Sequence, residues 1–142
     1  MRQFVTMLAA IWLTGACGLL LDNPSPERAR LVIVGDSDKS VRLITSTNFL
    51  AAVNEQGQTR VEMFVSDTVI TTLPYERVFD IEDDQRFLVE AAWIDTDLEA
   101  VSVQVFLDDA IRFDEAGLLI EGQPYRFVYM FNQAFTRDIL LL

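Results

Sequence analysis

The chain has 142 residues, with 22 acidic and 11 basic side chains, a formal net charge of −11, one cysteine and no histidine. The negative charge disfavours binding to nucleic acid or, through the overall field, to an anionic lipid surface. Without histidine the chain has no Ser-His or Cys-His nucleophile pair and lacks the commonest ligand of zinc and copper. Because 51% of the residues are hydrophobic, the composition predicts a domain stabilised by burial rather than by disulfides.

Residues 1–17 contain the parts of a secretory signal in order. Arg2 is basic, residues 4–13 are apolar, and small side chains stand just before Cys17. Residues 13–17 resemble the lipobox of bacterial lipoproteins, with Thr14 where leucine is commoner. The resemblance implies that residues 1–16 are a signal peptide and that Cys17 becomes the diacylated first residue. Cleavage there removes one basic residue and no acid, which leaves 126 residues with a net charge of −12.

Two other interpretations of this segment stay open. The apolar run continues to Leu21, giving about eighteen residues, near the lower limit for a membrane-spanning helix, so an uncleaved anchor is one alternative. Cleavage by the general peptidase, with Cys17 incidental, is the other. All three place the domain outside the cytoplasm, and the lipid anchor places it in the bacterial cell envelope. Gly18 follows the cysteine where aspartate would stand in the inner-membrane signal, which resembles outer-membrane sorting in a host with two membranes.

After a linker over residues 17–28, which holds two prolines, residues 29–142 follow the pattern of strands separated by turns. Apolar and polar residues alternate along several runs, and no apolar stripe of helical period has helical length. The sequence therefore predicts one antiparallel β-sandwich of seven to nine strands, of immunoglobulin-like or transthyretin-like type. The side chains expected in its core are Phe87, Trp93, Val101, Val103, Val105 and Phe127.

The strand boundaries follow from turn chemistry. Tight turns are expected at residues 54–58 and at Asp108 and Asp109, and Pro74 is expected to end or bend a strand. The predicted strands cover residues 30–34, 41–49, 59–65, 67–73, 76–81, 86–95, 101–107, 110–113, 118–121 and 125–133; the runs 59–65 and 67–73 are consecutive parts of one hairpin arm.

Carboxylates are the remaining candidates for catalysis, since a glycosidase requires only two acids and a groove. Glu90 stands between Leu88 and Ala92, which indicates a desolvated carboxylate that could act as a general acid. The pattern favours a simpler interpretation, in which Glu90 faces solvent or pairs with Arg42 or Arg126 across the sheet.

Asp95, Asp97 and Glu99 stand at alternate positions between two predicted strands. Such carboxylates can converge on calcium, and the acidic turn at residues 82–84 is a possible second contributor. The segment lacks the glycine and the distal glutamate of an EF-hand loop. Solvated acidic loops are the usual outcome in an acidic protein, so we expect no cofactor, with calcium as the alternative.

The aromatic strand near the end of the chain has two interpretations. Tyr125, Phe127, Tyr129 and Phe131 alternate on one face, while Val128 and Met130 lie on the other, so both faces are apolar. Either a C-terminal segment folds over one sheet and buries these residues, or the aromatic side chains form an exposed patch for a partner protein or a lipid-like ligand.

Three segments are similar to the extracytoplasmic domain of MmpS-type proteins, membrane-anchored accessory β-sandwiches of actinobacteria: Val34, Gly35 and Asp36, then residues 72–79, then residues 101–109. Here a lipobox replaces the transmembrane anchor, and the C-terminal cysteines of that family are missing. The resemblance implies an accessory role and transfers no site residue. We therefore expect a membrane-tethered, non-catalytic interaction domain with an envelope protein as partner. A calcium- or ligand-binding module and a carboxylate-only hydrolase are the alternatives.

Overall fold

The computed structural model describes residues 25–36, 39–94 and 99–142, and within them the chain forms ten strands and no helix. Cys17 and the predicted signal segment lie outside the described residues. In chain order the strands are β1 (Arg28–Val34), β2 (Ser40–Val53), β3 (Thr59–Thr72), β4 (Tyr75–Asp80), β5 (Arg86–Trp93), β6 (Glu99–Leu107), β7 (Ala110–Leu119), β8 (Tyr125–Met130), β9 (Gln133–Phe135) and β10 (Ile139–Leu141).

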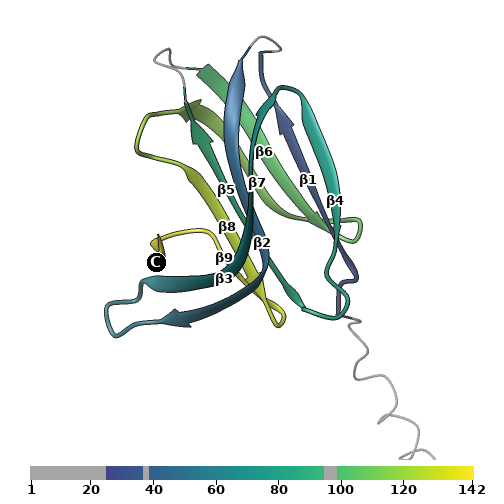
Figure 1. The fold of residues 1–142 in the computed structure, drawn as a ribbon, viewed down its shortest axis with the longest axis vertical. Coiled ribbons are helices and arrows are strands. Elements are labelled where there is room, and N and C mark those ends of the chain that lie inside the picture. The colour runs from purple at the N-terminus through teal and green to yellow at the C-terminus, as the bar shows by residue number, and fades with distance from the viewer. Residues whose placement is uncertain (1–24, 37–38, 95–98) are drawn as a thin grey trace, which may run out of the picture.

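The strands form two sheets that lie face to face (Figure 1). One sheet has the order β4-β1-β6-β7, and the other has the order β10-β3-β2-β5-β8-β9. All neighbouring pairs are antiparallel except β10 with β3, which is parallel. The predicted all-β sandwich is therefore confirmed. The structure adds two strands of three residues each, β9 and β10, which are too short to show a period-two pattern.

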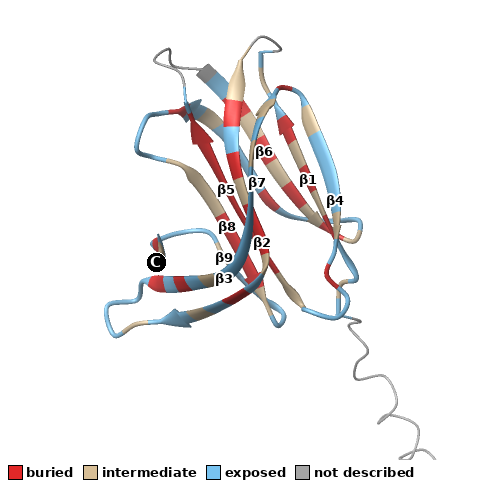
Figure 2. Cartoon of the chain, in the orientation of Figure 1, coloured by how far each residue is buried: buried red, intermediate tan, exposed pale blue. Residues whose placement is uncertain are grey.

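The main core fills the space between the two sheets (Figure 2). Alternation directs every second side chain of β1, β5 and β6 inward, where the side chains are removed from water. All six side chains predicted for the core lie there: Phe87, Trp93, Val101, Val103, Val105 and Phe127. The strand β6 shows the clearest alternation of apolar and polar residues in the sequence. It lies inside its sheet, between β1 and β7.

Strands β2 and β3 form a hairpin of 14 residues on each side that bends away from the sandwich at its far end (Figure 1). The register of this pair shifts between Thr45 and Asn48, at a β-bulge. The Ser46 hydroxyl donates to the carbonyl of Val65 and accepts from the amide of Asn48, which ties the bulge together. Bulges bend a strand and increase its twist. The hairpin therefore curls over the outer face of the six-stranded sheet.

The curled hairpin encloses a second apolar cluster on that outer face. Phe49 and Val61 come from the hairpin, Leu88 and Val128 from the sheet beneath, and Ile139 from β10. The face of β8 that carries Val128 is thus covered by a later segment of the chain. This confirms, for Val128, the interpretation in which a C-terminal segment folds over one sheet.

Several predicted boundaries need correction. The runs 59–65 and 67–73 form one strand, β3, and Pro74 follows its end as expected. The runs 110–113 and 118–121 are joined in β7, because Gly117 continues the ladder opposite Val101 instead of forming a turn. The turn at residues 54–58 is confirmed: the Asn54 side chain accepts from two backbone amides, and Gly57 adopts a positive φ of 81°.

Candidate functional site

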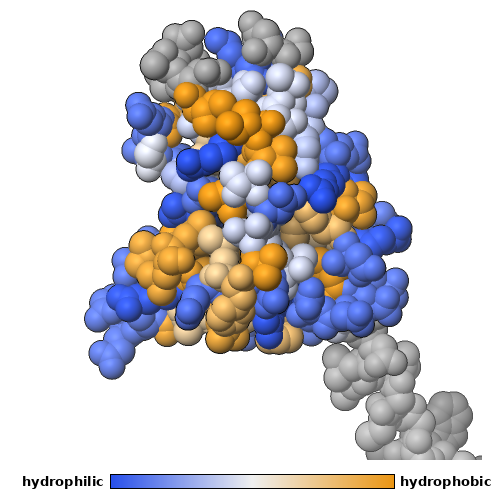
Figure 3. All heavy atoms as spheres, viewed as in Figure 1, coloured by the Kyte–Doolittle hydropathy of each residue, from blue (hydrophilic) through white to orange (hydrophobic). Residues whose placement is uncertain are grey.

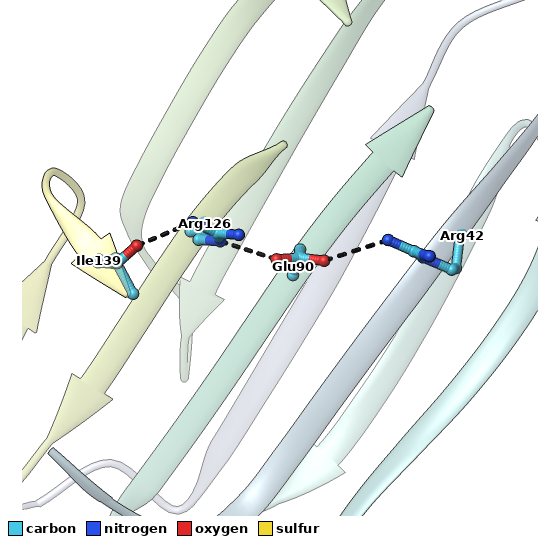
Figure 4. A network of polar contacts seen from close by, with 4 residues as sticks. All are labelled: Arg42, Glu90, Arg126 and Ile139. Carbon is cyan, nitrogen blue, oxygen red and sulfur yellow. Dashed lines mark hydrogen bonds and ion pairs between the residues drawn. The ribbon is translucent and has the colours of Figure 1, made fainter. Parts of the chain in front are cut away.

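Glu90 lies in the middle of β5 on the outer face of the six-stranded sheet, and only 4% of its surface is exposed. Its cross-strand neighbour on β8 is Arg126, whose Nε donates to Oε2 over 2.7 Å. On the other side, Nη2 of Arg42 lies 3.6 Å from Oε1 (Figure 4). Each carboxylate oxygen therefore faces a guanidinium group, and the interaction links three neighbouring strands.

The ion pair favoured by the sequence pattern is thus present, with both arginines instead of one. A buried carboxylate is costly unless it is paired and hydrogen-bonded, and the two guanidinium groups meet that requirement. Nη1 of Arg126 also donates to the carbonyl of Ile139 over 2.8 Å. Glu90 therefore orients Arg126, and Arg126 holds β10 against the sheet.

The predicted aromatic patch does not form. Phe127 and Tyr129 are exposed by 0% and 4% and lie in the main core, and Tyr125 packs against that core. The error has a simple cause: these side chains alternate toward the other sheet, where Phe113 of β7 lies 5.6 Å from Phe127 between ring centroids. Phe131 alone is exposed, in the turn after β8.

The pKa values of the two tyrosine hydroxyl groups on β8 are shifted by burial. Burial raises the pKa of Tyr125, and it also raises the pKa of Tyr129. The Tyr129 hydroxyl donates to Oδ1 of Asn132 over 3.1 Å in the turn that follows. Both phenols therefore stay protonated at neutral pH and act as core groups with a polar end.

The calcium site suggested by the sequence falls mostly outside the described residues. Asp95 and Asp97 lie outside the described residues, and Glu99 is the first residue of β6. No group of three potential metal ligands occurs among residues 25–36, 39–94 and 99–142.

On the upper half of the outer face of the six-stranded sheet, the described part of the chain leaves apolar side chains open. Ile70 and Ile94 are exposed by 66% and 42%, next to the half-buried Ile44 and the buried Ala92. Arg42 lies opposite both Ile70 and Ala92 in the strand register. Figure 3 shows hydrophobic residues gathered over the upper parts of β2 and β3, beside strongly hydrophilic ones. We call these five residues the uncovered face.

The sequence contained part of the signal for the uncovered face. Ile44 and Ile94 stand at outward positions of alternating runs, where a polar residue is expected. Nothing in these local patterns indicates that the hairpin covers Leu88 and Val128 and leaves Ile70 open. Which residues are covered depends on where the β2–β3 hairpin bends. The position of that bend depends on contacts between segments that are distant in the sequence.

A cleft of about 390 Å³ opens beside the bulge, between the edges of the two sheets. The guanidinium of Arg77 on β4 lies 3.1 Å from Oδ2 of Asp67 on β3, so an ion pair bridges the two edge strands. Inward-pointing charges of this kind also oppose edge-to-edge aggregation. The other lining residues are Thr45, Ser46, Thr47, Asn48, Val65, Ser66, Phe79 and Asp84. Most of these residues carry a hydrogen-bonding side chain.

The described residues include no helix able to cross a membrane. No family model, no curated protein and no solved structure matches the chain.

Proposed function

We propose that this chain is a membrane-tethered, non-catalytic interaction domain of the bacterial cell envelope. The uncovered face docks on an envelope protein. One observation carries the proposal: Ile70 and Ile94 stand open to solvent on a sheet whose lower outer half is covered by the chain's own hairpin. Contiguous exposed apolar surface of this kind marks interaction sites in soluble domains.

The composition of the uncovered face supports a protein as the partner. Three isoleucines surround Arg42, and arginine beside apolar side chains is characteristic of protein interfaces. An anionic membrane surface fits less well, because the whole chain carries a net charge of −11. Glu90 is buried and paired, so the carboxylate of this region is engaged in holding the sheet together.

A lipid tether on Cys17 is compatible with docking through the uncovered face. The strand β1 begins at the end of the sandwich opposite the upper parts of β2 and β3 (Figure 1). A linker of about eleven residues after Cys17 reaches at most about 35–40 Å. A lipid on Cys17 therefore keeps the domain close to the bilayer, with the uncovered face at the distal end.

The tether is tested by replacing Cys17 with serine. The wild-type protein is expected in the detergent-extracted membrane fraction, with an N-terminal peptide whose intact mass includes acyl chains. Cys17→Ser removes the acceptor thiol, so the protein should leave that fraction and lose the added mass. Identical partitioning and identical peptide masses for the two proteins would eliminate the lipid anchor.

The docking face is tested by site-specific photo-cross-linking in intact cells. A photo-reactive amino acid is placed at position 70, and a matched control carries it at position 111, an isoleucine exposed by 47% on the other sheet. An adduct with another envelope protein is expected from position 70 and not from position 111. Equal adducts from both positions, or none from position 70, would refute docking through this face.

A further inference from the structure

The strand β10 is held in place by few interactions. It pairs with β3 over only three residues, Ile139 to Leu141, and the ladder is flanked by two backbone hydrogen bonds of 2.9 Å. Among the described residues, the other polar contact of β10 is the bond from Arg126 to the carbonyl of Ile139. A cavity of about 400 Å³ borders Ile139 and Arg126. β10 is therefore open toward this cavity.

The surface beneath β10 has the features of a strand-binding groove. Ile139 is 7% exposed and packs on Phe49, Val61, Leu88 and Val128. The edge of β3 supplies backbone donors and acceptors at residues 59–61. An extended peptide that adds to a sheet edge is recognised in this way, with the backbone giving affinity and alternate side chains giving specificity.

The groove extends further than β10 does. β3 has 14 residues, and among the described strands none pairs with the β10 side of β3 over residues 62–72. That open stretch carries the exposed side chains of Phe64 and Val65. A strand that enters parallel to β3 and continues past Val61 therefore gains backbone pairs that β10 does not make.

We infer that the β3 edge is a binding site for an extended segment of a partner protein, which displaces β10 and adds to the sheet in parallel. The segment has an aliphatic residue at the position of Ile139 and a second one two residues later, at the position of Leu141, because these two side chains contact the second apolar cluster. Arg126 donates to the carbonyl of the incoming strand as it does to that of Ile139. This inference does not depend on the uncovered face.

The experiment locks β10 in place. Arg60 and Leu140 lie opposite each other in the parallel ladder and are both exposed, so cysteines at these positions are within reach of a disulfide. Arg60→Cys/Leu140→Cys is made in full-length protein with Cys17→Ser, so that no third thiol is present. The probe is a fluorescein-labelled peptide with the sequence of residues 136–142, and binding is followed by fluorescence anisotropy.

The peptide is expected to bind the Cys17→Ser parent, and to bind the oxidised double variant at least tenfold more weakly. Reduction should restore binding to the variant and leave the parent unchanged, which also shows that the variant is folded. A control peptide with aspartate at the position of Ile139 should not bind. Equal binding to locked and reduced forms, or no binding to the parent, would overturn the inference.

Discussion

Replacing Phe127 by alanine is expected to lower the free energy of unfolding by about 3–5 kcal/mol. The side chain is fully buried between the sheets, next to Phe113, so truncation removes its contacts and leaves a cavity. A domain of this size is stable by about 5–15 kcal/mol, so the variant loses a large part of that margin. The measurement is urea denaturation followed by intrinsic fluorescence.

Phe131→Ala is the matched control, because Phe131 belongs to the same predicted aromatic face but is 55% exposed. Its ring contacts the Arg86 guanidinium, 4.9 Å from the ring centroid, which is worth about 0.5–1 kcal/mol at an exposed site. We therefore expect a loss of about 1 kcal/mol or less. Similar losses from the two substitutions would mean that Phe127 does not lie in the core.

Arg126→Leu is expected to lower the free energy of unfolding by about 3–5 kcal/mol. The substitution removes the 2.7 Å contact with Glu90 and the bond to Ile139, so a carboxylate with 6% side-chain exposure keeps only the more distant Arg42. Breaking one side of a buried pair costs more than the pair contributes, because the remaining charge stays buried.

A double substitution distinguishes this mechanism from simple loss of packing. Glu90→Leu/Arg126→Leu removes the buried charge together with its partner, and Arg42 remains solvated. The double variant should therefore regain most of the stability lost in Arg126→Leu, as measured by a double-mutant cycle. If the two substitutions lowered the free energy of unfolding additively, the cost of Arg126→Leu would not come from a buried, unpaired Glu90. For comparison, Glu76→Gln removes an exposed partner of Arg30 and should cost at most about 1 kcal/mol.

The features that the sequence predicted correctly depend on neighbours in the chain or on directly opposed strands. Alternation placed Phe87, Trp93 and Val103 in the core, because a side chain of a strand has only two faces to choose from. The ion pair between Glu90 and Arg126 was foreseeable for a related reason: a charge at an inward or half-buried position of a strand requires a cross-strand partner.

The features that could not be predicted depend on contacts between distant segments. The curl of the β2–β3 hairpin arises at a bulge near Ser46, where the sequence has neither glycine nor proline to mark it. The parallel pairing of β10 with β3 joins residues about eighty apart, and three residues are too few to show a period. These two features decide that Val128 is covered and Ile70 is open, and therefore where docking is possible.

The most direct test of the docking proposal is the yield of the cross-link from position 70 in cells whose protein also carries Ile94→Asp. Ile94 belongs to the uncovered face, and Ile94→Asp replaces its apolar surface by a hydrated carboxylate, which is costly to bury in an interface even beside Arg42. The proposal predicts that the yield falls about tenfold or more, which corresponds to at least 1.4 kcal/mol. Ile111→Asp, on the other sheet, should leave the yield unchanged. An undiminished yield with Ile94→Asp, or an equal fall with Ile111→Asp, would contradict it.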